Sequence, residues 1–598
     1  MAETLLSPGV LARETDQSFL TQAPVTAGAA IIGPTVLGPV EVPTLVTTYS
    51  DYLNRFGGSF LSGGQQYSFL TQISAYNYFQ NGGTSLLVTR VASGSFTSAT
   101  ASIGNFFVTS STTPLTNGAT GFNSASGEFS FTSSFVISTI AEGDIMNSIS
   151  GSDSAVVYGA DSTNGSLASG SVDNLRWQIT GRDTDTGTFS LLVRQGNDDT
   201  NNANVVETWA NLSLDPTQPN YISRVIGDQY RSFSSTDGAH VQTNGTFPNQ
   251  SRYIYVSRVN KPTPNYFDNS GNPVAAYAAY LPVASSGSFG GAAGSIYTGT
   301  GKFYNNISSS DTQGLTGANY NNAISLMANQ DDYVFNVISV PGLTIADNSS
   351  QITTLVNNVQ SRGDAIVVAD PRLYGDTVSE AVTSALTVNS SYAAAYWPWV
   401  MTLDPGTGQM VWVPASTMVP AVYAFNDSVS EPWFAPAGIN RGGLETVIQA
   451  ERKLTQSQRN TLYNGNVNPI ATFPGTGVVI YGQKTLQKRA SALDRVNVRR
   501  LVIALKSYIS QVALNLVFEQ NTIATRNAFL SQVNPYLESV QQRQGLYAFR
   551  VIMDDSNNTP DVIDRNMMVG QIYLQPTKTA EFIYLDFNIL PTGATFPG

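Results

Sequence analysis

The chain has 598 residues, of which 41% are hydrophobic and 12% are charged, and its formal net charge is −12 at pH 7. Soluble domains usually carry about 25% charged residues. The length and the apolar content predict several packed domains and exclude an intrinsically disordered chain. Because nucleic-acid phosphates require a basic surface, the acidic balance disfavours direct nucleic-acid binding.

The polar share of the chain comes mostly from Ser, Thr, Asn, Gln and Gly, with few ionic side chains. Removing hydroxyl and amide groups from water costs little free energy when they form hydrogen bonds in the contact. Such a surface favours burial in contacts between proteins.

Residue types that carry catalysis or bind metals are scarce. The sequence has no Cys and one His, His240, in a Gly-rich segment that we expect to be an exposed loop. Cys chemistry is therefore excluded, and zinc sites and Ser-His-Asp triads lack their usual ligand or base. Asp370 follows a predicted strand, but Pro371 comes next and favours a turn. We predict no catalytic residue, no cofactor, no metal site, and a protein that is not an enzyme.

Targeting signals are also missing from the sequence. No apolar run approaches the roughly 18 residues that a membrane-spanning helix needs. The start, Met1 to Thr4, lacks the basic and apolar regions of a secretory signal peptide. We expect no signal peptide, no membrane insertion, and assembly in the cytoplasm.

Residues 1–22 contain few core-forming side chains and read either as a frayed terminus or as an arm that orders against a partner. From residue 23 the pattern becomes globular, and residues 23–92 are expected to form the first segment of an α/β core. Ala29 to Ile32 predicts a buried strand, Ser50 a helix cap, and Phe69 to Phe79 a helix with apolar spacings of three and four.

Residues 93–265 change character, because helical periodicity gives way to Ser/Thr/Gly-rich sequence with short alternating runs. This pattern predicts one or more inserted β-rich outer domains, with one short helix near Tyr221 to Ile226.

Residues 266–485 are expected to be the second segment of the α/β core. Val334 to Val340 and Ala365 to Ala369 predict buried strands that flank a helix, and the helix carries an apolar stripe. This order is typical of a βαβ unit with parallel strands. The stripe consists of Ile352, Leu355, Val356 and Val359.

Residues 486–590 predict a compact α+β domain, followed by a tail over 591–598. Leu501, Leu505 and Val512 lie on one face of a long helix, and a second helix is expected to be interrupted or restarted by Pro535. Three strands follow, over 546–553, 568–574 and 581–590. The fold class is therefore α/β and α+β multidomain: an α/β core, inserted β-rich outer domains, and a small α+β C-terminal domain.

Positive charge is concentrated between Glu451 and Lys506, a stretch that contains ten basic residues and two acidic ones. Two interpretations stay open. The stretch is either a solvated helix face or an electrostatic docking surface for an acidic protein or for neighbouring copies.

The order of several short motifs resembles the contractile-tail sheath proteins of bacteriophages and related injection machines. Each motif is weak alone, and residues 93–175 lie outside the resemblance. The motifs are Ser7-Pro8-Gly9-Val10, Ala30-Ile31-Ile32-Gly33, Asn77-Tyr78-Phe79, Val88-Thr89-Arg90-Val91, Asn211-Leu212-Ser213-Leu214-Asp215, Tyr396-Trp397-Pro398-Trp399, Asn497-Val498-Arg499-Arg500-Leu501, Phe518-Glu519-Gln520-Asn521 and Glu581-Phe582-Ile583.

The resemblance implies a structural subunit of a virion tail. Such subunits form hexameric rings that stack helically around a tail tube and contract from a metastable extended state. The implied partners are other copies of the chain, a tail tube protein, and baseplate and tail terminator proteins.

The resemblance also implies two sets of contact residues. Strand exchange between subunits would use Pro8, Gly9, Val10, Leu11, Phe582, Ile583, Tyr584 and Leu585. A basic surface facing the tube would consist of Lys488, Arg489, Arg495, Arg499, Arg500 and Lys506.

Two other classes of protein remain open. A β-rich surface adhesin or tail-associated structural protein would share the Cys-free, acidic, Ser/Thr/Gly-rich composition, but it would not need βαβ units. A carboxylate-dependent hydrolase needs neither His nor Cys, yet it needs two acids in one pocket, and the sequence places no such pair.

Overall fold

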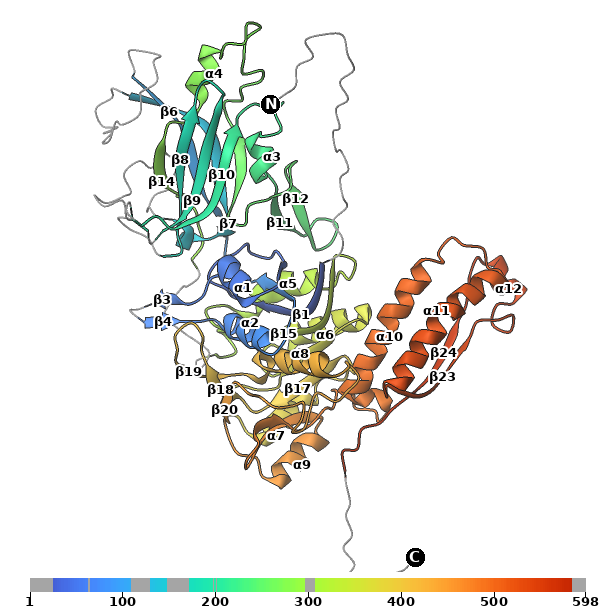
Figure 1. Cartoon of the computed structure of the whole chain (residues 1–598). Coiled ribbons are helices and arrows are strands. Elements are labelled where there is room, and N and C mark those ends of the chain that lie inside the picture. The colour runs from blue at the N-terminus through green and yellow to red at the C-terminus, as the bar shows by residue number, and fades with distance from the viewer. Residues whose placement is uncertain are drawn as a thin grey trace, which may run out of the picture.

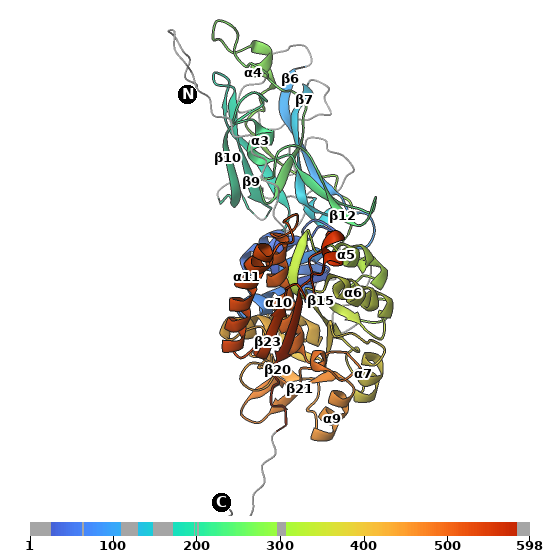
Figure 2. The same ribbon diagram turned by 90° about the vertical axis from the view of Figure 1, so that its right-hand side faces the viewer.

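The structure is a computed structural model, and its three parts are drawn in Figures 1 and 2. An α/β core lies in the middle, a β-rich region lies at one end of it, and a helical C-terminal domain projects from its side. The structure describes residues 25–62, 65–108, 129–147, 172–196, 198–199, 202–295 and 307–582.

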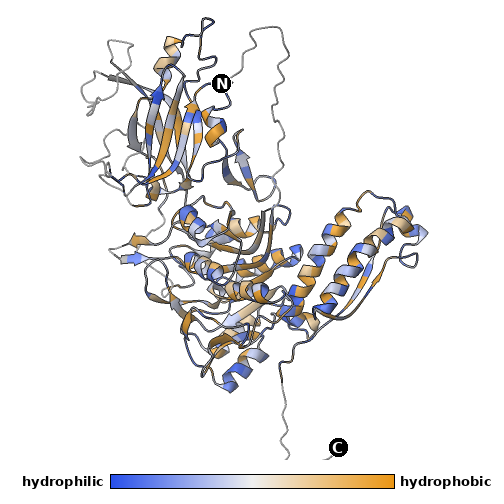
Figure 3. Cartoon of the chain, viewed as in Figure 1, coloured by the Kyte–Doolittle hydropathy of each residue, from blue (hydrophilic) through white to orange (hydrophobic). Residues whose placement is uncertain are grey.

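The core is built on one eight-stranded sheet whose inner strands are parallel. These strands are nearly continuous apolar runs, as expected for strands covered on both faces; Figure 3 shows the hydropathy of the residues along the chain. In spatial order the sheet contains β2 (Thr44–Val46), β5 (Leu86–Arg90), β1 (Val25–Gly33), β15 (Tyr333–Thr344), β16 (Ile366–Asp370), β17 (Ala393–Trp397), β21 (Val467–Phe473) and β22 (Gly477–Ile480).

Helices cover both faces of this sheet, and each face has its own apolar cluster. The predicted stripe of Ile352, Leu355, Val356 and Val359 is fully buried in one of them, which confirms that helix. One face carries α1 (Tyr49–Phe56), α2 (Leu70–Gln80) and α8 (Val419–Val429). The other carries α5 (Asn321–Leu326), α6 (Ser349–Arg362), α7 (Val378–Ala385) and α9 (Gln456–Asn464).

Local details of the core differ from the sequence predictions. The cap of α1 is Thr48, whose hydroxyl accepts a hydrogen bond from Asp51 N at 3.0 Å, so the assignment to Ser50 was wrong. Strand β15 continues past Pro341 to Thr344, because the partner strand β16 resumes pairing with it there. Two small sheets flank the core: β3 (Phe60–Ser62) with β4 (Gln65–Tyr67), and β18 (Val400–Leu403) between β19 (Met410–Val413) and β20 (Val447–Ala450).

The β-rich region separates β5 from β15 in the sequence, so it is inserted into the core fold. Two antiparallel sheets pack around a shared apolar cluster that includes Trp177 and Phe189. The sheets have the orders β10-β9-β8-β14 and β13-β7-β6. Their strands are β6 (Ser98–Val108), β7 (Phe129–Glu142), β8 (Leu175–Asp183), β9 (Thr188–Gln195), β10 (Val205–Ser213), β13 (Ile254–Val259) and β14 (Ser285–Ser288).

The expected boundary after residue 265 is wrong, because β14 pairs with β8 and Phe289 is buried in the same cluster. The structure also contains the predicted short helix, α3 (Ile222–Ile226). The hairpin β11 (Tyr230–Ser234) and β12 (His240–Asn244) reaches the core, where Val241 packs against the core cluster. The helix α4 (Ala275–Tyr280) completes the region.

The C-terminal domain consists of the antiparallel helices α10 (Val496–Leu514) and α11 (Ile523–Gln542), the hairpin β23 (Leu546–Ile552) and β24 (Gln571–Pro576), and the short helix α12 (Pro560–Asp564). Leu501, Leu505 and Val512 are buried between these elements, as predicted. Pro535 does not interrupt α11, since Val533 and Leu537 on either side of it are buried in the domain core. Of the third predicted strand only Glu581 and Phe582 are described, and they lie outside any strand.

Candidate assembly surfaces

Of the residues predicted for strand exchange, the structure describes only Phe582. Pro8, Gly9, Val10, Leu11, Ile583, Tyr584 and Leu585 lie outside the described residues. Phe582 is described and is 67% exposed, and its ring meets the ring of Tyr463 edge-on with 6.4 Å between centroids.

The predicted basic surface is only half present. Lys488, Arg489 and Lys506 are exposed. Arg495 is partly buried and forms ion pairs with Asp494 at 2.9 Å and with Glu581 at 2.7 Å. The surface therefore carries less free positive charge than the sequence suggested.

Arg499 and Arg500 do not belong to this surface, which corrects the prediction. Both are at most 5% exposed, because they lie at the start of α10 where it packs on the core. Arg499 stacks 4.0 Å from the ring centroid of Tyr392. Arg500 donates to Asp427 and stacks on Tyr423. These arginines hold the C-terminal domain on the core.

The hairpin β23–β24 is a two-stranded sheet, so each strand has one edge without a paired strand among the described residues. Its inner face, which includes Phe549 and Leu574, packs on α11. Its outer face carries Arg550 and Tyr573, which form a cross-strand pair. Free strand edges bind added strands through main-chain hydrogen bonds.

The far end of the α10–α11 pair exposes a group of large apolar side chains. Phe518, in the connecting loop, is fully exposed and has φ +72, a conformation that bulky residues seldom adopt. The loop is nevertheless fastened, because Asn521 donates to the carbonyl of Met567 at 2.9 Å. We name this group the apolar tip; it consists of Leu514, Val517, Phe518 and Ile523.

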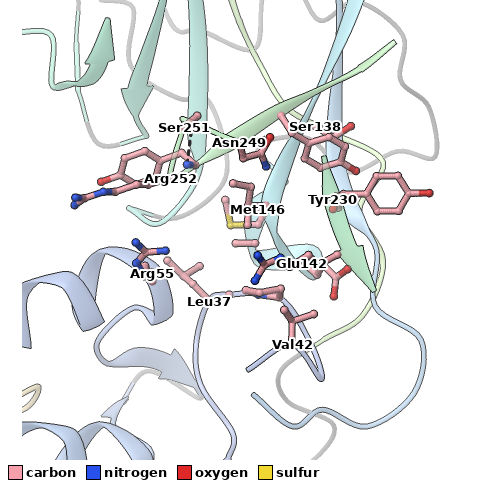
Figure 4. A pocket seen from close by; sticks show the side chains of 18 of the residues that line it. Leu37, Val42, Arg55, Ser138, Glu142, Met146, Tyr230, Asn249, Ser251 and Arg252 are labelled. Atoms are coloured by element: carbon pink, nitrogen blue, oxygen red, sulfur yellow. Dashed lines mark hydrogen bonds between the residues drawn. The ribbon is translucent and has the colours of Figure 1, made fainter. Parts of the chain in front are cut away.

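A cleft of about 1400 Å³ lies between the β-rich region and the core (Figure 4). Leu37, Val42 and Arg55 line it from the core, and Tyr230 and Arg252 line it from the β-rich region. Its lining is mixed in polarity and brings together no set of catalytic groups.

Polar contacts tie the two sides of this cleft. The buried Arg90 donates to the carbonyl of Glu142 at 2.9 Å, and the Glu142 carboxylate accepts from Val40 N at 3.0 Å. Burial raises the pKa of Glu142. Arg252 reaches Asp51 across the cleft at 3.7 Å.

Asp370 is a buried structural carboxyl. It does not form the predicted turn with Pro371; it accepts hydrogen bonds from the backbone N–H of Ser416 at 2.9 Å and from the Ser416 hydroxyl. Burial raises its pKa to about 7, against the opposing effect of these bonds. The contact joins the end of β16 to the turn before α8.

The part of the chain that the structure describes contains no candidate metal site. No group of three or more His, Asp or Glu residues is arranged there to hold a metal ion. His240 begins strand β12, where a loop was expected, and its Nδ1 lies 3.0 Å from the carbonyl of Gly238. None of the described helices is both long and apolar enough to span a bilayer.

Comparison with known families identifies the second half of the chain. Residues 313–486 match the phage tail sheath protein central domain, and residues 489–590 match the phage tail sheath C-terminal domain. This half of the chain therefore carries the two tail sheath domains. The matched stretches hold the larger part of the central sheet and the domain that carries the hairpin and the apolar tip.

Tail sheath proteins of phages are also similar in sequence. The tail sheath protein of Vibrio phage KVP40 is 39% identical over 267 residues, which cover 45% of this chain and 38% of the relative. That of Enterobacteria phage T4 is 33% identical over 278 residues, or 43% of this chain and 42% of the relative. The matches thus span about two fifths of the length of these sheath proteins.

Solved sheath structures resemble the chain more distantly. The sheath tail protein Lin1278 of Listeria innocua has 10% identity and a TM-score of 0.49, with 92% of this chain and 96% of that one covered. The contracted PVC sheath complex of an extracellular contractile injection system has 24% identity and a TM-score of 0.38, with 42% and 70% covered.

Several residues at these surfaces were not foreseen from the sequence. Tyr463 and Gln483 contact the segment that follows β24, and nothing in their local sequence marks them. Phe518 lies in a motif that carried the family resemblance, yet its exposure follows only from the structure.

Proposed function

We propose that this protein is the structural subunit of a contractile tail. It polymerises as stacked hexameric rings around a tail tube, and contraction from a metastable extended state drives the tube through the envelope of the target cell. The presence of both sheath domains carries this proposal. The protein acts by assembly and rearrangement, without catalysis, as a component of the virion tail.

Strand exchange links the subunits. The hairpin β23–β24 is the acceptor, because both of its outer edges are open among the described residues. The donors are the arm around Pro8 to Leu11 and the strand predicted over residues 581–590. Main-chain hydrogen bonds then join the subunits whatever the side chains are, and the links survive a change in subunit orientation.

Three exposed cations, Lys488, Arg489 and Lys506, serve tube docking. Their contribution is electrostatic and weakens as salt is added. The apolar tip is a further surface that we expect to be covered in the assembled tail, because contiguous exposed apolar groups mark contact sites. Baseplate and terminator proteins contact the ends of the polymer.

The β-rich region faces outward in this proposal. It is tied to the core by polar contacts around Arg90 and Glu142 and by apolar packing of the β11–β12 hairpin, and the cleft lies between the two parts elsewhere. A small interface of this kind lets the β-rich region change its orientation relative to the core at a lower free-energy cost than a large, continuous apolar interface would. The outer region therefore re-packs against its neighbours during contraction while the strand links persist.

Co-expression with a candidate tube protein, followed by negative-stain electron microscopy, tests the proposal. Striated cylinders of sheath diameter around the tube are expected. A surface adhesin would give small uniform particles and a hydrolase monomers, with or without the tube protein, and either result would contradict the proposal.

A further inference from the structure

The segment that follows β24 is fastened to the rest of the subunit by contacts centred on the carboxylate of Glu581. Glu581 Oε1 accepts from Arg495 Nε at 2.7 Å, and Oε2 accepts from Arg495 Nη2 at 3.0 Å. The hydroxyl of Tyr463 also donates to Oε2. Gln483 Nε2 lies 3.2 Å from Oε1 and 2.7 Å from the Thr579 hydroxyl. We call Tyr463, Gln483, Arg495, Thr579 and Glu581 the Glu581 clamp.

The negative charge of the Glu581 carboxylate is paired with the positive charge of Arg495. Partial burial opposes ionisation of Glu581, but the hydrogen bonds from Arg495 and Tyr463 and the Arg495 charge keep its pKa below the usual value. Asp494 holds the other side of the Arg495 guanidinium at 2.9 Å. Lys484 stacks 4.2 Å from the Tyr463 ring centroid. The carboxylate is thus bound in a preformed site.

The three residues that bind the Glu581 carboxylate come from separate elements, two of them in the core and one at the start of the C-terminal domain. Tyr463 lies near the end of α9, Gln483 follows β22, and Arg495 caps α10. The side chains of Glu581 and Arg495 are 19% and 24% exposed. A bidentate pair of this burial is stronger than an exposed surface pair.

The position of the clamp restricts where the following residues go. Strand β24 ends at Pro576, and Thr577 still bonds to the carbonyl of Gly545 at the base of the hairpin. A return of the chain to pair with β24 of the same subunit would need residues 577–582 as the connection, since the loops of β-hairpins are short. The clamp holds these same residues on the core.

We propose that Glu581 fixes the point and the direction in which residues 583–590 leave the subunit, so that their strand pairs with another copy and not with its own hairpin. This inference rests on the proposed function. An unrestrained strand would meet its own hairpin at millimolar effective concentration, and intramolecular pairing would then compete with exchange. The clamp removes this competition and stays closed in the polymer.

The experiment uses Glu581→Gln and Arg495→Gln, with Asp494→Asn as the matched control. Asp494→Asn removes the other carboxylate bound to Arg495 and touches nothing after β24. Because the sequence has no Cys, spin labels on Ser457→Cys in α9 and Ala580→Cys report the distance between the clamped segment and the core without background. The second readout is the yield of sedimentable polymer formed with the tube protein.

The full-length protein and the control are expected to give one narrow distance distribution in the dispersed state and the same polymer yield. The two clamp variants should give a broad distribution and about a five- to tenfold lower yield, because the strand is free to fold back. An unchanged distribution in Glu581→Gln, or a broad one with an unchanged yield, overturns the inference.

If the proposed function itself is wrong, the experiment gives a different result. In that case the unmodified protein itself forms no polymer with the tube protein, while the distance distribution still tests the clamp. Unfolding curves of the variants within a few degrees of the parent establish that a lower yield reflects the freed segment.

Discussion

Arg500 Nη2 lies 2.5 Å from Asp427 Oδ2, and its guanidinium stacks 4.8 Å from the ring centroid of Tyr423. A residue expected on a docking surface thus joins the first turn of α10 to α8 in the core. The contact shows how the C-terminal domain is attached: charged side chains at the base of its first helix are buried against polar and aromatic groups of the core.

Arg500→Glu should therefore lower the stability of the folded protein, because Arg500 is buried and does not lie on the surface proposed to dock on the tube. The substitution places a carboxylate at a buried position facing the partly exposed Asp427, and a buried charge that loses its partner costs about 3–5 kcal/mol. Chemical denaturation measures the loss. Lys506→Glu, at an exposed site on the same helix, is expected to change stability by no more than about 0.5 kcal/mol. Equal stability of the two variants would contradict the burial of Arg500.

Asp370 should make stability depend on pH. Its pKa is raised from 3.8 to about 7 by burial, so the folded state holds a proton that the unfolded state loses as pH rises through this range. The stability that this proton provides is full below about pH 4 and is lost by pH 7. Asp370→Asn keeps a neutral partner for Ser416.

The gain of Asp370→Asn over the parent in unfolding free energy is therefore expected to grow from pH 4 to pH 7 and to level off above it. Thermal or urea unfolding at several pH values checks this. A gain that is the same at all pH values would show that folding does not raise the pKa of Asp370.

Phe518→Gly should lower the yield of polymer without lowering the stability of the folded subunit. Glycine adopts φ +72 without strain, so the free energy of unfolding should stay equal or rise by about 1 kcal/mol. Polymer yield should fall, because the apolar tip loses its largest side chain. Leu386→Ser, which removes an exposed apolar side chain on the core, serves as the control. If both variants assemble alike, the tip is not a contact surface.

Reversal of two exposed cations, as in Lys488→Glu with Arg489→Glu, should weaken tube docking more at low salt than at high salt. Co-sedimentation with the tube protein at about 50 and 500 mM salt measures the effect. Equal losses at both salt concentrations would indicate a packing defect in place of an electrostatic contact.

The sequence predicted elements with a strong period and failed where tertiary contacts decide. The stripe from Ile352 to Val359 and the helix through Leu501 to Val512 lie where periodicity placed them. Pro535 was expected to break α11, but burial of its neighbours holds the helix together. Thr48 and Ser50 are equally good caps by residue type, and only the backbone selects one.

The candidate site was harder to predict, because charge in a sequence does not reveal exposure. Arg499 and Arg500 resemble Lys488 and Arg489 in sequence, yet the first two are buried and the last two are exposed. The Glu581 clamp unites residues that lie far apart along the chain, such as Tyr463 and Glu581, and no local pattern marks such a meeting.

The central claim is that subunits polymerise by strand exchange onto the β23–β24 hairpin. It is tested most directly by sedimentation and electron microscopy of the full-length protein beside a form lacking residues 1–20, each with the tube protein. The account predicts cylinders from the full-length protein and folded, dispersed subunits from the truncated form. Cylinders from both forms would contradict it.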